Sequence, residues 1–220
     1  RAERQGTRMR RFISRKEKKM RNNNTTGTLY MVELALMVAI IFIMAFTPLG
    51  YFQTLGLSIT FLTVPVAVGA ILLGPKGGAV CGLAFGITSL MQCFGIGFFG
   101  TMLFSINPAA TAFTCIVPRV LEGWLCGLIF RAARRVMKNG AYLTASLACP
   151  VLNTVLYMTS LVVFFYQTDY IQGFAQTFGT TNPFLFVVAF VGVQGLIEAA
   201  VCCVIAGAVS RTLAVALKQV

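Results

Sequence analysis

The chain has 220 residues, of which 57% are hydrophobic and only 11% are charged, and its formal net charge is +12. A soluble domain carries about 25% charged residues, so this composition excludes one and indicates a polytopic helical membrane protein. The charge does not indicate nucleic-acid binding, because ten of the 18 Lys and Arg lie in the first 21 residues and the others gather at the ends of apolar segments.

Enzymatic and metal chemistry find little support in the sequence. The chain has no His and a single Asp, which removes the commonest general base and a paired-aspartate site. The phosphate-binding pattern G-x-x-x-x-G-K-[ST] is missing, and the seven Cys show no C-x-x-C spacing. We therefore expect no catalytic residues, no metal and no cofactor in this chain, and we expect the cysteines to act as small packing residues.

Six apolar segments follow a basic and polar stretch at residues 1–27, which we interpret as a cytoplasmic tail. Each segment approaches the roughly 20 residues that a spanning helix needs. The expected spans cover about residues 28–47, 58–74, 78–93, 108–130, 142–166 and 184–209. These spans form one membrane domain, residues 28–212, which leaves residues 213–220 as a cytoplasmic end.

The distribution of basic residues between the spans predicts the topology. The segments after the second, fourth and sixth spans carry Lys76, the cluster at 131–138, and Arg211 with Lys218. The segments after the other three spans carry no Lys or Arg, and cytoplasmic loops are the ones enriched in these residues. We predict an all-α bundle of six transmembrane helices with both termini in the cytoplasm.

Glycines recur at helical spacing in two of the expected spans. Gly78, Gly82 and Gly86 are each four residues apart, and Gly123 and Gly127 repeat the spacing in the next span. Small residues at this spacing let helix backbones approach closely within a membrane. We interpret these glycines as packing positions inside the bundle.

Ionisable residues inside the expected spans are the first candidates for a site. Arg119 lies about 18 Å, at roughly 1.5 Å per residue, from the basic cluster that follows its span. Glu122 lies one turn further along, and Glu198 falls near the middle of the last span. Such residues are costly in lipid and face protein or water. Two readings remain open: an internal ion-pair network, or a polar cavity that holds a ligand or an ion.

Uncharged polar residues and helix breakers accompany these charges. Asn153 falls near the middle of the fifth span, and Gln194 lies four residues before Glu198 on the same helical face. Asn107-Pro108 and Pro118 interrupt helices, and backbone groups freed at such breaks often line cavities. The uncharged loops expected outside the cell, rich in aromatic and amide side chains, suggest a lid over an amphipathic organic solute.

Several stretches of the chain resemble one transporter family. They are TPLGY at 47–51, LSITFLTVPVAVGAILLGPKGGAVCGLAFGITS at 57–89, and SINP at 105–108 followed by Pro118-Arg119. With an A-x-x-x-A pair at Ala35 and Ala39, this pattern is similar to the substrate-binding S components of energy-coupling factor (ECF) transporters. The resemblance covers about residues 28–212 and implies import of a water-soluble vitamin into a bacterial cell.

The resemblance also implies partners and site residues. Expected partners are a transmembrane scaffold subunit, contacted by Ala35 and Ala39, and two cytoplasmic ATPase subunits, with the chain itself in the plasma membrane. The resemblance favours a ligand site in the outer loops and the outer halves of the later helices. The ligand-binding candidates are Asn107, Asn153, Gln194, Glu198, Arg119, Tyr51 and Phe52.

The vitamin itself is not specified by any motif. The pattern resembles pantothenate-type members most, so pantothenate is the first expectation, and cobalamin and riboflavin follow. A pantothenate carboxylate would need a cation or a helix N-terminus, and Arg119 is the one cation expected inside the bundle. Two other functions stay open: a stand-alone secondary carrier or channel that uses Glu122 and Glu198, and a membrane scaffold without a ligand.

Overall fold

The computed structural model describes residues 27–47, 50–53, 58–95, 97–137, 140–177, 179 and 182–216. The chain divides into two compact units, residues 1–36 and 37–220. The first helix, Gly27–Ala45, begins in the first unit and ends in the second. The expected cytoplasmic tail, residues 1–27, lies outside the described part apart from Gly27, and so do residues 217–220 of the expected C-terminal end.

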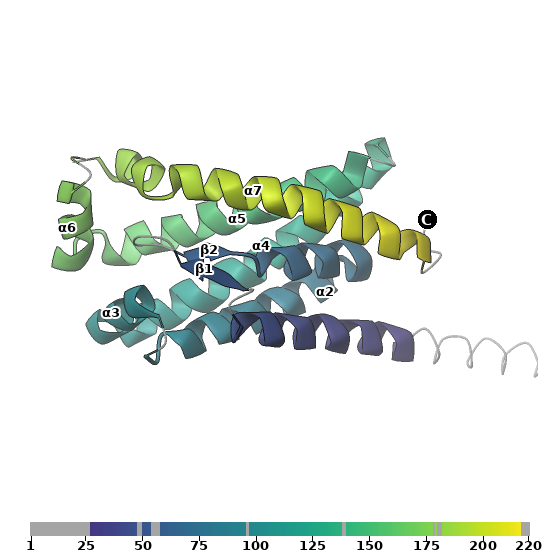
Figure 1. Cartoon of the computed structure of the whole chain (residues 1–220), viewed down its shortest axis with the longest axis horizontal. Helices are drawn as coiled ribbons and strands as arrows, with labels where there is room; N and C mark the ends of the chain where they lie inside the picture. The colour runs from purple at the N-terminus through teal and green to yellow at the C-terminus, as the bar shows by residue number, and fades with distance from the viewer. Residues whose placement is uncertain are drawn as a thin grey trace, which may run out of the picture. The chain divides into compact units, whose positions relative to one another are not determined.

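The second unit is predominantly helical and includes a small hairpin of two strands (Figure 1). Its elements in chain order are β1 (Tyr51–Gln53), β2 (Ser58–Thr60), α2 (Thr63–Gln92), α3 (Phe98–Ile106), α4 (Pro108–Val136), α5 (Gly140–Phe165), α6 (Asp169–Thr177) and α7 (Pro183–Ala216). Helix α2 packs against α4, α4 against α5, and α5 against α7, while α7 also contacts α2 and β2.

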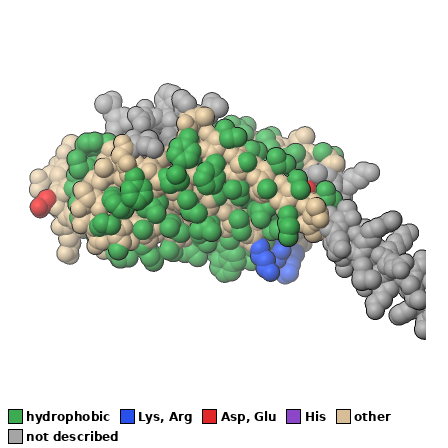
Figure 2. Space-filling model, turned by 90° about the horizontal axis from the view of Figure 1, so that it is seen from below, with side chains coloured by type: hydrophobic (Ala, Val, Ile, Leu, Met, Phe, Trp, Pro, Cys, Tyr) green, Lys and Arg blue, Asp and Glu red, His purple; other side chains and the backbone are tan. Residues whose placement is uncertain are grey.

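Five helices among the described residues are long and apolar enough to cross a bilayer. They are the first helix, α2, α4, α5 and residues 195–216 of α7. The sequence predicted six spans, and the difference in count arises within α2, which contains two of the predicted spans. Figure 2 shows one face of the molecule covered mainly by hydrophobic side chains, as a lipid-facing surface requires.

Helix α2 is a helical hairpin rather than one straight rod. Gly74 has φ 76° and ψ −173°, outside the helical region, and Pro75 follows it. A side chain built on Gly69 would have its Cβ 2.6 Å from the sulfur of Cys81, although a straight helix would separate these residues by about 18 Å. The chain therefore reverses at Gly74, and a shorter arm, residues 63–73, packs against a longer arm, residues 75–92.

A glycine face on the longer arm of α2 packs directly against α4. A Cβ on Gly78 would overlap the backbone of Gly123, and one on Gly82 would overlap the carbonyl oxygen of Arg119. A Cβ on Gly86 would lie 2.9 Å from the Cys115 carbonyl oxygen. The glycines thus bring two backbones together inside the bundle, and the close approach fixes the position of α4 beside α2.

The β-hairpin changes the expected start of the second span. Residues 58–60, predicted to be helical, instead pair antiparallel with β1, with Tyr51 opposite Thr60 and Gln53 opposite Ser58. Helix α2 begins only at Thr63. The hydropathy of this stretch does not distinguish strand from helix, whereas the β-branched Ile59 and Thr60 favour the strand.

Two short helices occupy stretches that were expected to be loops. Helices α3 and α6 lie at the same end of the second unit, opposite the C-terminal end of α7 (Figure 1). Asp169 stands in the first turn of α6, where a negative charge stabilises the helix dipole. At the start of α7, the Asn182 side chain accepts a 3.0 Å hydrogen bond from the backbone N–H of Phe184.

Candidate functional site

The position of Arg119 follows from the proline that precedes it in α4. A proline inside a helix has no N–H, so Pro118 leaves the carbonyl of Thr114, four residues earlier, without its helical donor. The Nη1 atom of Arg119 donates a 2.8 Å hydrogen bond to this carbonyl oxygen. Pro118 therefore leaves the Thr114 carbonyl without its helical donor, and Arg119 supplies the replacement donor.

Two aromatic rings pack against the same guanidinium. The Arg119 Cζ lies 4.3 Å from the ring centroid of Tyr157 on α5 and 5.2 Å from that of Phe85 on α2. Both separations are within the roughly 6 Å range of cation–π attraction, which strengthens when the groups are removed from water. Arg119 is 8% exposed, so its charge is held inside the bundle by a carbonyl and two rings.

Glu122, one turn further along α4, is completely buried. Its Oε1 accepts a 3.2 Å hydrogen bond from the thiol of Cys149 on α5, and its Oε2 has no hydrogen-bond partner. A buried carboxyl with one oxygen that makes no hydrogen bond is costly.

Glu198 on α7 completes the cluster from the opposite side. It is 7% exposed, and Thr60, Thr63 and Asn153 lie beside its carboxyl group. Its Oε1 has no hydrogen-bond partner, and neither does the Oδ1 of Asn153. Strand β2, α2, α5 and α7 thus present polar groups to one buried region, to which α4 contributes Arg119 and Glu122.

This polar cluster, defined as Arg119, Glu122, Asn153 and Glu198, is incompletely satisfied. The sequence left two readings open, an internal ion-pair network or a polar cavity, and across the described ranges no salt bridge joins the guanidinium to either carboxylate. The Nε of Arg119 also has no hydrogen-bond partner. No set of three or more acidic, Cys or His side chains in the described residues is arranged to hold a metal ion. The cluster thus contains one buried N–H donor, the Nε of Arg119, and three buried acceptor oxygens, of Glu122, Asn153 and Glu198, that have no hydrogen-bond partner.

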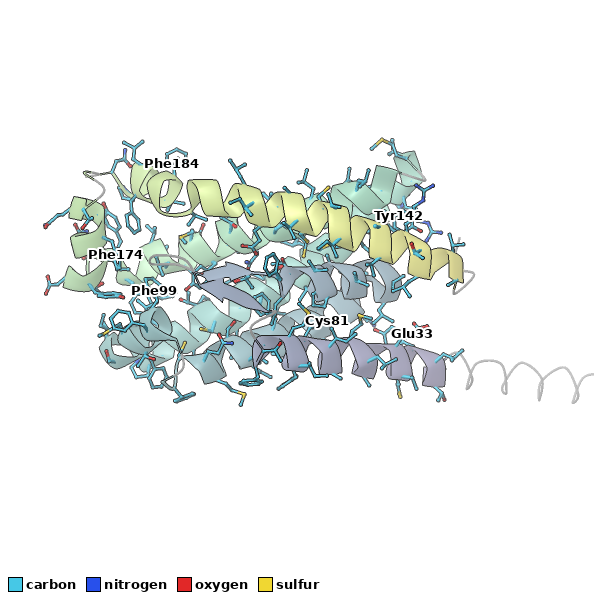
Figure 3. All side chains as sticks on the ribbon, in the orientation of Figure 1. Glu33, Cys81, Phe99, Tyr142, Phe174 and Phe184 are labelled. Atoms are coloured by element: carbon cyan, nitrogen blue, oxygen red, sulfur yellow. The ribbon has the colours of Figure 1, made fainter. Side chains whose placement is uncertain are left out.

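An aromatic cluster lies between the polar cluster and the end of the molecule formed by α3 and α6. Phe99 of α3 packs on Tyr170 and Phe174 of α6, with ring centroids 5.9 Å and 6.3 Å apart, and Figure 3 shows Phe99 and Phe174 approaching each other from their two helices. Burial raises the pKa of the Tyr170 phenol, whose oxygen has no hydrogen-bond partner. Tyr157, packed on the same apolar core, connects this cluster to Arg119.

The other predicted ligand residues occupy different positions. Asn107 is exposed and caps α4, where its Oδ1 accepts a 3.1 Å hydrogen bond from the N–H of Ala110. Tyr51 and Phe52 lie in β1, and Gln194 lies in α7, but their side chains are outside the described structure. The structure therefore brings together Arg119, Asn153 and Glu198, and it places Asn107 at the start of α4.

The predicted partner-contact residues lie on the first helix. Ala35 belongs to the first compact unit and Ala39 to the second, one turn apart along the same helix. Ala39 is exposed. Residues four apart share a helical face, so the two alanines form one small-residue stripe.

Sequence reasoning named Tyr157 beside Asn153 but missed two contributors to the polar cluster, Cys149 and Thr63. Cys149 and Tyr157 lie four residues before and four residues after Asn153, so α5 presents all three on one face. This periodicity could have revealed Cys149, but the assignment of cysteines to packing concealed it. The sequence could not assign Thr63 to the cluster, because it did not show that the start of α2 lies beside Glu198.

Comparisons with known proteins find one matching family and two similar transporters. The family described as "ECF transporter, substrate-specific component" matches residues 29–210. The pantothenate transporter PanT of Leuconostoc mesenteroides subsp. mesenteroides is 34% identical over 134 residues, which cover 58% of this chain and 61% of that protein. The pantothenic acid transporter PanT of Lactococcus lactis subsp. cremoris is 31% identical over 118 residues, covering 50% and 59%. The alignments thus span about three fifths of these relatives.

The family match covers most of the chain, including every helix that can cross a bilayer except the ends of the outermost ones. The apolar helices agree with a membrane protein. The chain is a multi-pass membrane protein and belongs to the family of substrate-specific components of ECF transporters.

Proposed function

We propose that the chain is the substrate-binding subunit of an ECF transporter in a bacterial plasma membrane and that it binds pantothenate for import. The observation that carries this proposal is the Arg119 guanidinium, buried without a carboxylate partner among the described residues. A buried cation in a solute-binding protein favours an anionic ligand. The names of the two relatives make pantothenate the first candidate.

The polar cluster has the pattern of groups that pantothenate requires. This vitamin carries a carboxylate, an amide and two hydroxyl groups. The carboxylate would accept from the Nε of Arg119, and the hydroxyl or amide hydrogens would donate to Asn153 Oδ1 and Glu198 Oε1. Each of these buried atoms has no partner of its own, and binding would remove that cost. Cobalamin and riboflavin are the next candidates, and they would use the aromatic residues more than the cation.

The aromatic contact between α3 and α6 would act as the gate. Phe99 and Phe174 belong to short helices rather than to long loops, so they can separate and close as two small rigid elements. Asn107, at the junction of α3 and α4, and Tyr51 with Phe52 in the β-hairpin would complete the entrance. Gln194 would reach the ligand from α7.

We infer that import requires partners, because the family is that of the substrate-specific component of a transporter. We infer that a transmembrane scaffold subunit docks on the stripe of Ala35 and Ala39, where small side chains permit close helix approach. Two cytoplasmic ATPase subunits would supply the energy.

We also infer six membrane crossings with both termini in the cytoplasm. The reversal of α2 at Gly74 supports the sixth crossing, because its two arms run in opposite directions. Lys76 beside the turn and the basic last turn of α4, with Arg134 and Arg135, would lie on the cytoplasmic side.

Isothermal titration calorimetry of the purified full chain in detergent, with pantothenate as the probe, tests the proposal. We expect saturable binding at a 1:1 ratio, and transport in liposomes only when the scaffold and ATPase subunits are present. Arg135→Ala, an exposed arginine on the same helix, serves as the matched control for Arg119→Ala. Ion-driven flux by the chain alone would instead support a secondary carrier, and the lack of binding to any vitamin would refute the proposal.

A further inference from the structure

The polar cluster contains more acidic groups than its single cation can balance. Arg119 faces two carboxyl groups, Glu122 and Glu198, all three at most 8% exposed. The ionisable groups that face Glu198 are Arg119 and Glu122 of α4 and Cys202 of α7, while β2, α2 and α5 present the uncharged Thr60, Thr63 and Asn153. One buried cation can compensate one buried anion, so a single ionised carboxyl is the arrangement that leaves no uncompensated charge in the cluster.

Glu122 is the better candidate for the carboxyl that is already neutral. It is completely buried, and its contacts include the Cys149 thiol, a weak donor that does little to stabilise an anion. Glu198 retains slight exposure and lies beside Thr63 and Asn153, which can accommodate either form. In the free protein, the positive charge of Arg119 is then balanced by an ionised Glu198 in the same buried region, without a salt bridge between the two among the described residues.

An anionic ligand disturbs this balance. Its carboxylate would bring a second negative charge to Arg119 while Glu198 remains in the same buried region. Two anions near one cation in a low dielectric are strongly unfavourable. Protonation of Glu198 removes the excess charge, and the resulting O–H can donate a hydrogen bond to the ligand.

We propose that binding of the ligand carboxylate at Arg119 is coupled to the uptake of one proton by Glu198. The proton leaves the acid form of the buffer and forms the O–H bond of the Glu198 carboxyl, so the ligand enters with its charge compensated. This inference rests on the proposed function, since it assumes that an anionic vitamin reaches the polar cluster. Under this proposal, Glu198 takes up a proton only when the bound ligand is an anion.

Calorimetry in a series of buffers with different ionisation enthalpies measures this proton directly. The observed binding enthalpy of pantothenate should vary linearly with the buffer enthalpy, with a slope that corresponds to about one proton taken up per ligand. Affinity should fall by up to about tenfold per unit as pH rises, because the bound state holds more protons. Pantothenol, in which an alcohol replaces the carboxylate, should bind with no dependence on the buffer.

Variants identify the acceptor. Glu198→Gln should bind pantothenate with an enthalpy independent of the buffer, and Glu33→Gln, a change in the first compact unit, should keep the wild-type slope. A zero slope for wild-type protein that still binds pantothenate would overturn this inference and leave the proposed function intact. A slope that persists in Glu198→Gln, or disappears in Glu122→Gln alone, would overturn the assignment to Glu198. Absence of any saturable heat would refute the proposed function and this inference with it.

Discussion

At the scale of single residues, Arg119 donates a hydrogen bond to the Thr114 carbonyl, and this bond fixes the guanidinium against the backbone of its own helix. The hydrogen bond holds the charge at one height in α4. In the proposed function, a ligand would therefore have to reach Arg119 past the aromatic rings that pack on the core around Tyr157.

Replacing this arginine should remove most of the binding energy that the ligand carboxylate provides. Hydrogen bonds to charged groups contribute about 1.5–3 kcal/mol, so Arg119→Ala should weaken pantothenate binding by roughly 10- to 100-fold in calorimetry. Arg119→Lys should recover only part of this loss, because an ammonium cannot both bond Thr114 and present a planar fork. Equal binding by Arg119→Ala and the Arg135→Ala control would show that the carboxylate does not reach Arg119.

Removing Pro118 should misplace Arg119 without altering its charge. In Pro118→Ala the new N–H can bond the Thr114 carbonyl, and Arg119 then loses its acceptor. A hydrogen bond of this kind contributes about 1 kcal/mol, so we expect roughly fivefold weaker binding with an unchanged or higher melting temperature. Pro150→Ala, which removes the proline inside α5, is the matched control. Weaker binding in both variants to the same extent would indicate a general loosening of the helices.

At the scale of elements, the contact between the longer arm of α2 and α4 determines how closely the binding residues approach one another. Gly82 touches the backbone of Arg119 itself, so a larger residue there would push α4 away from α2. Gly82→Ala should cost about 1–3 kcal/mol of stability and lower the melting temperature by several degrees. Gly192→Ala is the control, because a Cβ at that position of α7 would meet no atom within 4 Å. A melting temperature for Gly82→Ala that equals the Gly192→Ala value would contradict the close contact.

The aromatic contact between α3 and α6 should control the release of the ligand. Phe99 pairs with both Tyr170 and Phe174, and each such pair contributes about 0.5–1.5 kcal/mol. Phe99→Ala should therefore increase the dissociation rate of labelled pantothenate by roughly tenfold, measured by chase with unlabelled vitamin. Phe184, 74% exposed at the start of α7, provides the control. Unchanged dissociation in Phe99→Ala would exclude this contact as the gate.

The sequence predicted the long helices well, because a long apolar run is the main signal of a membrane-spanning helix. It also predicted the break at Gly74-Pro75 and the packing role of Gly78 and Gly82. The β-hairpin and the helices α3 and α6 were missed, since these stretches are short and their structure depends on contacts across the bundle. For the same reason Arg119, Asn153 and Glu198 were recognised individually, but the partners that orient them were not.

At the scale of the whole molecule, the proposed topology separates two positions that labelling can distinguish. Lys76 lies beside the turn of α2 and Asp169 begins α6. In intact cells, Asp169→Cys should react with a membrane-impermeant maleimide, whereas Lys76→Cys should react only after lysis. The unchanged chain gives the background of its seven native cysteines. Labelling of both positions from outside would contradict six crossings with cytoplasmic termini.

The reversal at Gly74 also has a consequence for biogenesis. The shorter arm of α2, residues 63–73, extends roughly 16 Å at 1.5 Å per residue, about half of the hydrocarbon core. A segment of that length has too little apolar surface to be retained in the bilayer as an independent span during synthesis. In the proposed topology, the two arms of α2 would therefore enter the membrane together, and the shorter arm would reach its final depth only after the glycine-rich longer arm has been synthesised.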